Sequence, residues 1–468
     1  MNISIMIAFF CYILILIFIS LFFSKKNKTS SDFMLGSRSI NYWVTAIALQ
    51  SSDMSHWLFL SLPGAIYTQG ITQAWIAIGL IGGVFLNWHF IAPKIRTETE
   101  KYNCITLFSY FQKKFNDNSG IIKITSACIT LIFFAFYISS GLVALGRLFT
   151  IIFNMNYHTG VLIGLGTTVA YTLIGGFVAV AWCDFFQGLF LLVMIILVPL
   201  FAYFSTEGWS EIAFVASEKN ISLSLFPKFS EITTILVPSL GWGLGYFGQP
   251  HILSFFMGIK DPKNISSAKK IGISWQIISL IASISVGVIG ISYFSQGIND
   301  PEMIFVQMTQ QLFAPLIAGF VLCSILAATL TTVDSQILTS GSIIAEDISS
   351  KLFKNKLSSK TTMLLSRVGS LLISIIALCI AWNDSKTIYD LVNYAWSGMG
   401  SAFGPLVIMS LYVKDINKYG AFTGIITGAT VSAVWPYFNT DILPLIPGFL
   451  LSGISIYTVS YITKEKNS

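Results

Sequence analysis

The sequence has few charged residues. Only 10% of its 468 residues are Asp, Glu, Lys or Arg, whereas 54% are hydrophobic and the mean hydropathy is +0.75. This composition excludes a soluble globular protein. The apolar runs are continuous over about twenty residues rather than short and alternating, which excludes a transmembrane β-barrel. The sequence therefore predicts an all-α polytopic membrane protein, with the lipid bilayer as its surroundings.

Cysteine and histidine are also scarce. The six cysteines are scattered singly and show neither a disulfide framework nor a metal-ligand spacing. The four histidines are not spaced as ligands either; they are His56, His89, His158 and His251. Because no nucleophile stands beside a paired acid and base, we expect no enzyme, no catalytic residue and no organic cofactor. The net charge of +6 comes from basic residues in short loops, which indicates membrane topology and not a nucleic-acid partner.

About thirteen apolar stretches are long enough to cross a bilayer. They are residues 3–23, 43–69, 72–93, 121–150, 158–179, 185–205, 232–257, 271–296, 312–348, 361–382, 389–413, 419–438 and 443–462. Most of the 27 basic residues fall on the side that the chain reaches after the first stretch. That side is expected to be cytoplasmic, which places the N-terminus outside and the C-terminus inside.

The second stretch, residues 43–69, carries polar residues at mid-membrane depth. Its middle reads Gln-Ser-Ser-Asp-Met-Ser-His-Trp from Gln50 to Trp57, and Pro63 and Gly64 follow. A buried carboxylate such as Asp53 is costly there unless a cation, a cavity or a helix end compensates it. We expect the helix to be interrupted at this point, because the exposed backbone groups of a broken helix bind ions.

A second weak point lies in residues 241–250, where four glycines and Pro250 occur within ten residues. Such a composition opens a transmembrane helix. Two interrupted segments in corresponding places of two halves indicate an inverted-repeat secondary transporter with its site at the midplane. The alternative is that the glycines only allow helices to pack closely.

Hydroxyl groups cluster in the middle of the stretch 312–348. Thr331 and Ser335 are four residues apart and share a helix face, with Thr332 beside them. Uncharged hydroxyl and carbonyl oxygens suit a monovalent cation that must be released in each cycle, whereas divalent ions need more carboxylates. The alternative is that these hydroxyls bond back to carbonyls of their own helix.

Several motifs together resemble the sodium/solute symporter family, in particular its bacterial sodium/proline symporters, over nearly the whole chain. The motifs are LGSRS at 35–39, SSDMSHW at 51–57, LPGA at 62–65, YISSG at 137–141, GWGLGYFGQPH at 241–251 and the stretch 327–335. The resemblance implies a LeuT-type core of two inverted five-helix repeats in the bacterial cytoplasmic membrane. The repeats would be 41–205 and 232–413, preceded by an extra helix and loop in 1–40 and followed by two helices in 414–468.

The resemblance also implies the site residues. A sodium ion, as the co-transported ion, would be bound by carbonyls of Ser51, Met54 and Ala328 and by hydroxyls of Thr331 and Thr332. Asp53 and Ser55 match residues implicated in coupling sodium to substrate. An aromatic cage for L-proline, the favoured substrate, would be formed by Trp57, Tyr137, Trp242, Tyr246 and Pro250. Aromatic faces would cover the pyrrolidine ring and the cationic imino nitrogen.

The sequence also leaves alternatives for a second cation site, the substrate and the coupling ion. A candidate second cation site consists of Asp184, Asp334 and Ser335, although Asp184 is more readily interpreted as a solvated loop residue. His56 stands where the related proline symporters tend to have glycine, so another small organic solute is an alternative substrate. Proton coupling is the other alternative, because Asp53, His56 and Asp334 titrate. A channel is disfavoured by the two unlike half-sites in one chain, and a functional monomer is expected.

Overall fold

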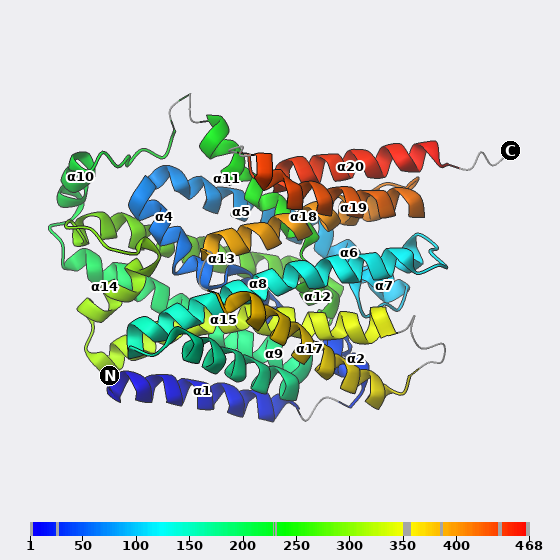
Figure 1. Ribbon diagram of the computed structural model, residues 1–468, viewed down its shortest axis with the longest axis horizontal. Coiled ribbons are helices and arrows are strands. Elements are labelled where there is room, and N and C mark those ends of the chain that lie inside the picture. The colour runs from blue at the N-terminus through cyan, green and yellow to red at the C-terminus, as the bar shows by residue number, and fades with distance from the viewer. Residues whose placement is uncertain are drawn as a thin grey trace.

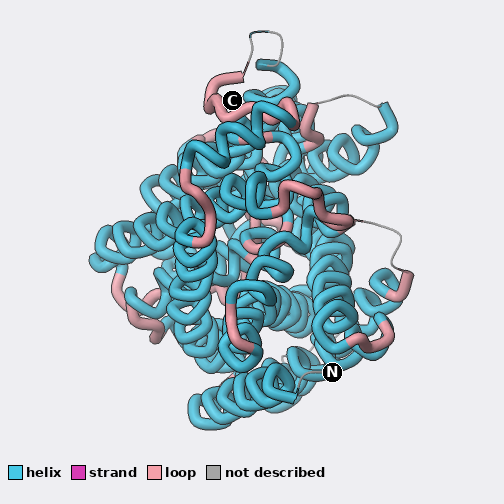
Figure 2. Tube along the Cα trace, turned by 90° about the vertical axis from the view of Figure 1, so that its left-hand side faces the viewer, coloured by secondary structure: helices cyan, strands magenta, loops and turns pink. Residues whose placement is uncertain are grey.

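The computed structural model describes residues 3–24, 28–227, 229, 232–349, 357–383, 387–438 and 442–464. Within these ranges the chain is built of helices, and the one extended pairing is an isolated bridge between Ile40 and Ile259. The long helices lie side by side along one direction, with the two termini at opposite ends of the bundle (Figure 1). Seen from one end, the helices form a compact bundle whose loops face the viewer (Figure 2). The predicted all-α class is confirmed.

Every stretch that the sequence predicts as a membrane crossing is mainly helical in the described residues, and two of them are interrupted. The long helices are α1 (Ile3–Ser24), α5 (Ala74–Leu86) with η4 (Asn87–Ile91) and α6 (Ala92–Lys101), α8 (Ile121–Phe153), α9 (Tyr157–Phe204), α13 (Ile265–Tyr293), α15 (Pro315–Ser342) with η10 (Ile343–Ile348), α17 (Ser359–Ala381), α18 (Ile388–Tyr412), α19 (Lys418–Val434) and α20 (Leu445–Ile462). In the part of the chain that the structure describes, eight helical stretches are long and apolar enough to cross a membrane on their own. The chain is thus a multi-pass membrane protein, and thirteen crossings remains a prediction.

Two further segments are interrupted helices. The first consists of α3 (Tyr42–Met54), η2 (His56–Leu58) and α4 (Ser61–Gln69), followed by η3 (Ile71–Gln73). The second consists of η6 (Ile232–Leu236), α11 (Val237–Gly241), the 3-10 segment η7 (Trp242–Gly248) and α12 (Pro250–Gly258). These are the two segments whose polar and glycine-rich middles predict interruption. Short helices join the others: α2 (Ser30–Leu35), η1 (Gly36–Arg38), α7 (Leu107–Lys114), α10 (Trp209–Glu218), η8 (Pro262–Asn264), η9 (Pro301–Met303), α14 (Ile304–Leu312) and η11 (Trp435–Phe438).

The region of Asp184 differs from the prediction. The sequence predicts helices at 158–179 and 185–205 with a break between them, and the 48 residues of α9 do consist of two helices, but these meet at a kink that lies earlier, at Gly176. At 1.5 Å per residue this stretch would be about 72 Å long if straight, far more than the roughly 30 Å hydrocarbon core. It turns at Gly176, where φ is 62° and ψ is −173°. Glycine allows this positive φ, so the turn lies before Asp184, which belongs to a helix and not to a loop.

Helix α15 lies at the centre of the bundle. It packs against α1, α3, α8, α9 and α17, and every residue from Val321 to Leu338 is buried. A polar side chain in such a place must find a hydrogen-bond partner on a neighbouring helix or its own. The threonines and the carboxylate in the middle of α15 are therefore fixed by contacts with α3 and α9, which build the candidate site.

Candidate sodium and substrate site

The first interruption exposes the carboxyl end of α3. The helix ends at Met54, and Ser55 has φ of 58° and ψ of −176°, which turns the chain out of the helix. The last carbonyl groups of α3 therefore lack amide partners in their own helix. They are available to side chains of a neighbouring helix and to a cation.

Two threonines of α15 meet these carbonyls. Thr331 Oγ1 donates to the carbonyl oxygen of Ser51 at 2.9 Å, and Thr332 Oγ1 donates to that of Ser52 at 2.6 Å. Both hydroxyls also lie near the carbonyl oxygen of Ala328, at 3.1 Å and 3.3 Å. A hydroxyl that donates one hydrogen bond keeps lone pairs for a cation. Several uncharged oxygens from α3 and α15 thus converge within hydrogen-bond distance of one another.

The structure brings most of the predicted sodium ligands together. Ser51, Ala328, Thr331 and Thr332 share the contacts just described, and Met54 is the last residue of α3. The prediction did not include the carbonyl of Ser52. Its role follows from the pairing of α3 with α15, which depends on their relative rotation and is not visible in one-dimensional spacing.

Asp53 lies beside this oxygen cluster and points to the other interrupted segment. Its side chain is 5% exposed, and its Oδ2 accepts a hydrogen bond of 2.5 Å from the hydroxyl of Tyr246 in η7. The second predicted coupling residue, Ser55, instead bonds to its neighbour, with its Oγ 2.7 Å from Nδ1 of His56. Asp53 therefore joins the first interruption to the second by a hydrogen bond.

A small cavity of about 30 Å³ adjoins Asp53. Its lining residues are Asp53, Met54, Trp57, Leu80, Tyr137, Trp242, Tyr246, Val392 and Trp396. Four of the five predicted cage residues are among them. Pro250 is not; it begins α12 and lines a separate cavity of about 20 Å³ together with Ser254 and Thr339. His56, whose presence raised doubt about the substrate, is buried but does not line the cavity.

Aromatic rings form the walls of this cavity. The ring centroids of Trp57 and Trp242 are 6.4 Å apart, and Trp396 meets Tyr246 edge-on at 5.1 Å. Trp396 Nε1 also donates to the carbonyl oxygen of Trp242 at 3.0 Å, which fixes the unwound backbone of η7. Trp396 was not among the residues predicted from the sequence, although a tryptophan beside Ser397 and Gly398 in a spanning helix was an available signal.

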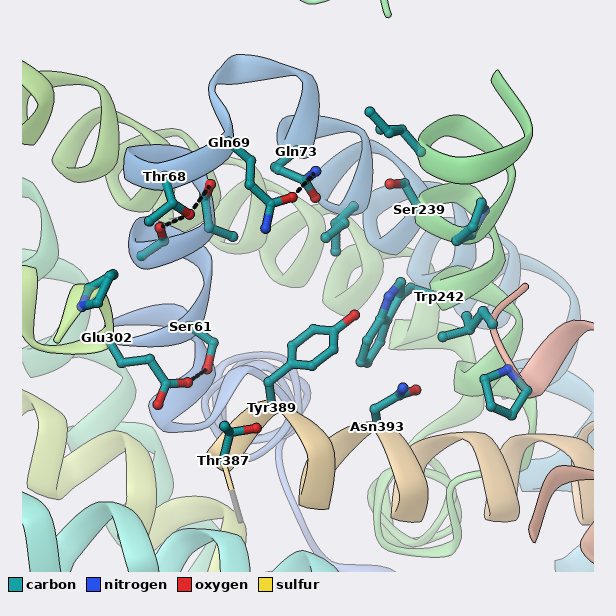
Figure 3. Close-up of a pocket in the computed structure, with 18 of the residues that line it drawn as sticks. Ser61, Thr68, Gln69, Gln73, Ser239, Trp242, Glu302, Thr387, Tyr389 and Asn393 are labelled. Atoms are coloured by element: carbon teal, nitrogen blue, oxygen red, sulfur yellow. Dashed lines mark hydrogen bonds between the residues drawn. The ribbon is translucent and has the colours of Figure 1, made fainter. Parts of the chain in front are cut away.

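A vestibule of about 660 Å³ lies next to the cavity (Figure 3). Trp242 lines both spaces and packs against Tyr389, with ring centroids 5.8 Å apart, so these two rings separate cavity from vestibule. On the vestibule wall, Glu302 accepts a hydrogen bond of 3.0 Å from Ser61 and pairs with Arg147 at 3.3 Å. Burial raises the pKa of Glu302, and the Ser61 and Arg147 contacts oppose this shift.

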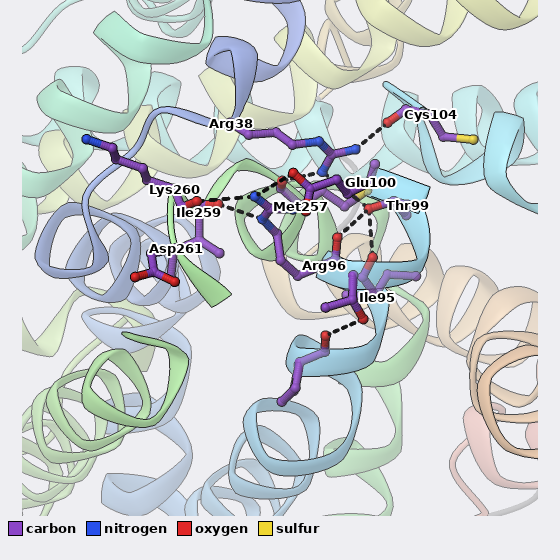
Figure 4. A network of polar contacts seen from close by, with 12 residues as sticks. Arg38, Ile95, Arg96, Thr99, Glu100, Cys104, Met257, Ile259, Lys260 and Asp261 are labelled. Atoms are coloured by element: carbon purple, nitrogen blue, oxygen red, sulfur yellow. Dashed lines mark hydrogen bonds and ion pairs between the residues drawn. The ribbon is translucent and has the colours of Figure 1, made fainter. Parts of the chain in front are cut away.

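Two arginines hold the end of α12: Arg38 from the loop before α3, and Arg96 from α6 (Figure 4). Arg38 donates to the carbonyl oxygens of Met257 and Cys104 at 2.6 Å and 2.8 Å, and Arg96 Nε donates to that of Ile259 at 2.6 Å. Burial, with Arg96 nearby, lowers the pKa of Arg38 to about 10, so its guanidinium stays charged at neutral pH. These bonds hold the loop before α3, the segment that follows α6 and the end of α12 together.

The three residues of the candidate second cation site also meet. Asp184 on α9 and Asp334 on α15 are both fully buried and interact electrostatically. Ser335 Oγ donates to Asp184 Oδ2 at 3.3 Å, and the hydroxyl of Tyr171, which sequence analysis missed, donates to Asp334 Oδ2 at 2.6 Å. The interpretation of Asp184 as a solvated loop residue is wrong. Two adjacent buried carboxylates require a proton or a cation between them.

This site is linked to the first one. Ser51 Oγ donates to the main-chain carbonyl of Asp184 at 2.9 Å, while the carbonyl of Ser51 accepts from Thr331. The described residues contain no group of three or more His, Cys, Asp or Glu side chains suited to a transition metal. The donor set as a whole consists of hydroxyls, carbonyls and few carboxylates, which suits a monovalent hard cation.

Comparisons with known proteins agree with this arrangement. The model of the sodium:solute symporter family matches residues 33–428. A high-affinity proline transporter of Bacillus subtilis is 41% identical, with 96% of each chain covered, and a sodium/proline symporter of Staphylococcus aureus is 39% identical, with 97% of this chain and 92% of the other covered.

Solved structures show the same fold. A sodium-coupled sialic acid symporter in a substrate-bound outward-open state superposes with a TM-score of 0.83 over 98% of both chains at 19% identity. A nucleobase–cation symporter in a closed conformation gives 0.59 at 15% identity, with 94% of this chain and 96% of the other covered. The LeuT-type fold is therefore confirmed. The chain belongs to the sodium:solute symporter family, whose members are membrane transporters and not enzymes.

Proposed function

We propose that this protein carries L-proline across the bacterial cytoplasmic membrane together with sodium. The observation that carries the proposal is the convergence of Thr331 and Thr332 with the carbonyls of Ser51 and Ser52, one residue from Asp53. The substrate's identity is supported by the aromatic cavity and by relatives named as proline transporters at about 40% identity.

The cavity chemistry fits a small amino acid with an apolar ring. Aromatic faces from Trp57, Trp242 and Tyr137 would cover the pyrrolidine ring, and the same faces attract the cationic nitrogen. Its 30 Å³ hold about two water molecules, so the rings must move apart to admit a substrate. Trp242 and Tyr389 stand between the cavity and the vestibule and are the rings whose displacement would admit it.

The two ends of the transport path through the helix bundle differ, and this difference supports alternating access. One end is a vestibule of about 660 Å³, whereas the other is fastened by Arg38 and Arg96. The helix α4, which lines the vestibule, lies at the same end of the bundle as the N-terminus (Figure 1). We propose that this end faces outward, because the basic loops favour a cytoplasmic C-terminus. In this orientation the structure is open to the outside, and the transporter works as a monomer with two five-helix repeats.

We propose that Asp184, Asp334 and Ser335 form a second cation site. It is supported by the complete burial of both carboxylates and by their link to the first site through Ser51. A cation there would neutralise charge that the apolar surroundings of α9 and α15 do not solvate.

Uptake by purified protein in liposomes tests the proposal. Labelled L-proline should accumulate under an inward sodium gradient and not when choline replaces sodium at fixed pH. Competition by a panel of amino acids and other small solutes then defines the substrate. Accumulation driven by a proton gradient without sodium would overturn sodium coupling, and a panel in which another solute competes better than proline would overturn the substrate.

A further inference from the structure

Two buried glutamines lie behind the contact between Tyr246 and Asp53. Gln50 on α3 and Gln276 on α13 are both 0% exposed. Gln50 Nε2 donates to the carbonyl oxygen of Gly272 at 2.9 Å and to Gln276 Oε1 at 3.2 Å. Gln276 Nε2 in turn donates to the hydroxyl oxygen of Tyr246 at 3.1 Å, and that hydroxyl donates to Asp53.

The donor and acceptor of each of these hydrogen bonds follow from the first bond, the one between Gln50 and the carbonyl of Gly272. A main-chain carbonyl only accepts, so Gly272 fixes which end of the Gln50 amide faces it. The same nitrogen donates to Gln276, whose oxygen end is thereby turned toward Gln50 and whose nitrogen end is turned toward Tyr246. A hydroxyl has one proton to donate. Because the Tyr246 oxygen already accepts from Gln276, its proton is directed to Asp53.

We propose that Gln276, oriented by Gln50, is a positioning residue of the coupling site that makes Tyr246 a hydrogen-bond donor to Asp53. The inference rests on the proposed sodium-coupled function and extends it to two residues outside the cation and substrate contacts. Without this pair, the Tyr246 hydroxyl could rotate and leave the buried Asp53 carboxylate without its donor. A buried acceptor that loses its partner costs more than the net value of the bond, so the orientation matters.

The same series of hydrogen bonds connects three structural elements that must keep their positions relative to one another. Gln50 comes from the first interrupted segment, Tyr246 from the second, and Gln276 from α13, which packs against α3. The main-chain carbonyl of Tyr246 accepts from Asn87 Nδ2 at 3.1 Å, so the backbone of this residue is held independently of its hydroxyl. A change at Gln276 therefore acts on the direction of the hydroxyl and leaves the position of the Tyr246 backbone to Asn87.

Sodium-dependent proline uptake by full-length protein in liposomes tests this role. Methionine is close to glutamine in length and has no amide, so Gln276→Met removes the donor to Tyr246 with little change of shape. We expect the sodium concentration for half-maximal uptake to rise by about threefold to tenfold, with the maximal rate changed less. Tyr246→Phe, which removes the hydroxyl itself, should give a rise of similar size.

The double variant separates positioning from packing. If Gln276 acts through the Tyr246 hydroxyl, Gln276→Met adds nothing in a Tyr246→Phe background, whereas a packing defect adds its full effect. Gln187→Met is the matched control. Gln187 is also a buried glutamine that donates to a tyrosine hydroxyl, that of Tyr12 at 2.8 Å, but it has no bond to Tyr246 or Asp53. Its half-saturating sodium concentration should stay within about twofold of the wild type.

An unchanged sodium requirement in Gln276→Met, or an equal rise in the Tyr246→Phe background, overturns the inference. If Gln276→Met does not fold, as judged by size exclusion in detergent, the same cycle with Gln50→Met decides, because Gln50 orients Gln276. Sodium-independent uptake by the wild type would instead overturn the proposed function. The two failures are therefore distinguishable.

Discussion

The hydroxyl of Thr332 on α15 lies 2.6 Å from the carbonyl oxygen of Ser52 on α3. This contact ties the buried centre of α15 to the open end of an interrupted helix. The same two oxygen atoms are in place to bind a cation between the helices. Ion binding and the distance between α3 and α15 are thus expected to change together.

Replacing Thr332 by valine tests the proposed sodium site. Valine keeps the shape of threonine and removes the oxygen, so the half-saturating sodium concentration should rise tenfold or more, about 1.4 kcal/mol. Thr329→Val is the control, because the Thr329 hydroxyl donates to Ile325 of its own helix at 2.8 Å. Equal sodium dependence in the two variants, measured by uptake, would rule out Thr332 as a ligand.

The aromatic cavity predicts a separate effect on the substrate. Trp242→Ala removes a ring that lines both cavity and vestibule, so the proline concentration for half-maximal uptake should rise about fivefold to 150-fold, equivalent to about 1 to 3 kcal/mol. The sodium requirement should change less. Trp382, which is 47% exposed, provides the control variant Trp382→Ala. If both constants of Trp242→Ala rise equally, the fold around η7 has collapsed and the cage assignment lacks support.

Substitutions of Asp53 are expected to have the largest effect on sodium-driven transport. Asp53→Asn keeps the size of the side chain and removes its charge, so sodium-driven accumulation should be lost while the protein still inserts and folds. Asp53→Glu keeps the charge but places it about one methylene too far, so partial transport with weaker sodium affinity is expected. Membrane levels and accumulated proline are the two measurements. Concentrative uptake by Asp53→Asn would show that Asp53 serves packing only.

The labelling rate of the Cys104 thiol tests whether Arg38 holds the loop that contains Cys104. Burial raises the pKa of the Cys104 thiol to about 11, so little thiolate is present at pH 8 and maleimide should react slowly. Arg38→Lys keeps the positive charge but cannot hold the carbonyls of Cys104 and Met257 with one planar fork. Labelling of Cys104, with the five other cysteines replaced, should therefore become several-fold faster. An unchanged rate would mean that the arginine does not hold this loop.

Local composition was sufficient to predict the interruptions. Serines around Asp53 and four glycines before Pro250 weaken a helix wherever it lies, so both breaks were visible without a structure. The hydroxyl pair on α15 was predicted for the same reason, since helix periodicity fixes which residues share a face. The all-α class followed from apolar runs alone.

Partners across helices could not be predicted in this way. Trp396, Tyr171 and Gln276 contribute through contacts with residues more than twenty positions away in the sequence, which depend on how helices pack. The loop interpretation of Asp184 failed because Gly176, not the polar residue, marks the turn in α9. Pro250 was carried into the cage with its motif, yet it starts the next helix and faces another cavity.

The hydrogen bonds that Arg38 and Arg96 donate to the end of α12 and the residues after it have main-chain oxygens as acceptors. Met257, Ile259 and Lys260 contribute carbonyl groups, which every amino acid possesses, so changing the side chain of Lys260 removes no bond. The Lys260 side chain is exposed to solvent. Lys260→Cys is therefore a suitable attachment point for a spin label or fluorophore, from which the opening of this end during turnover can be followed in real time without weakening the contact that is being observed.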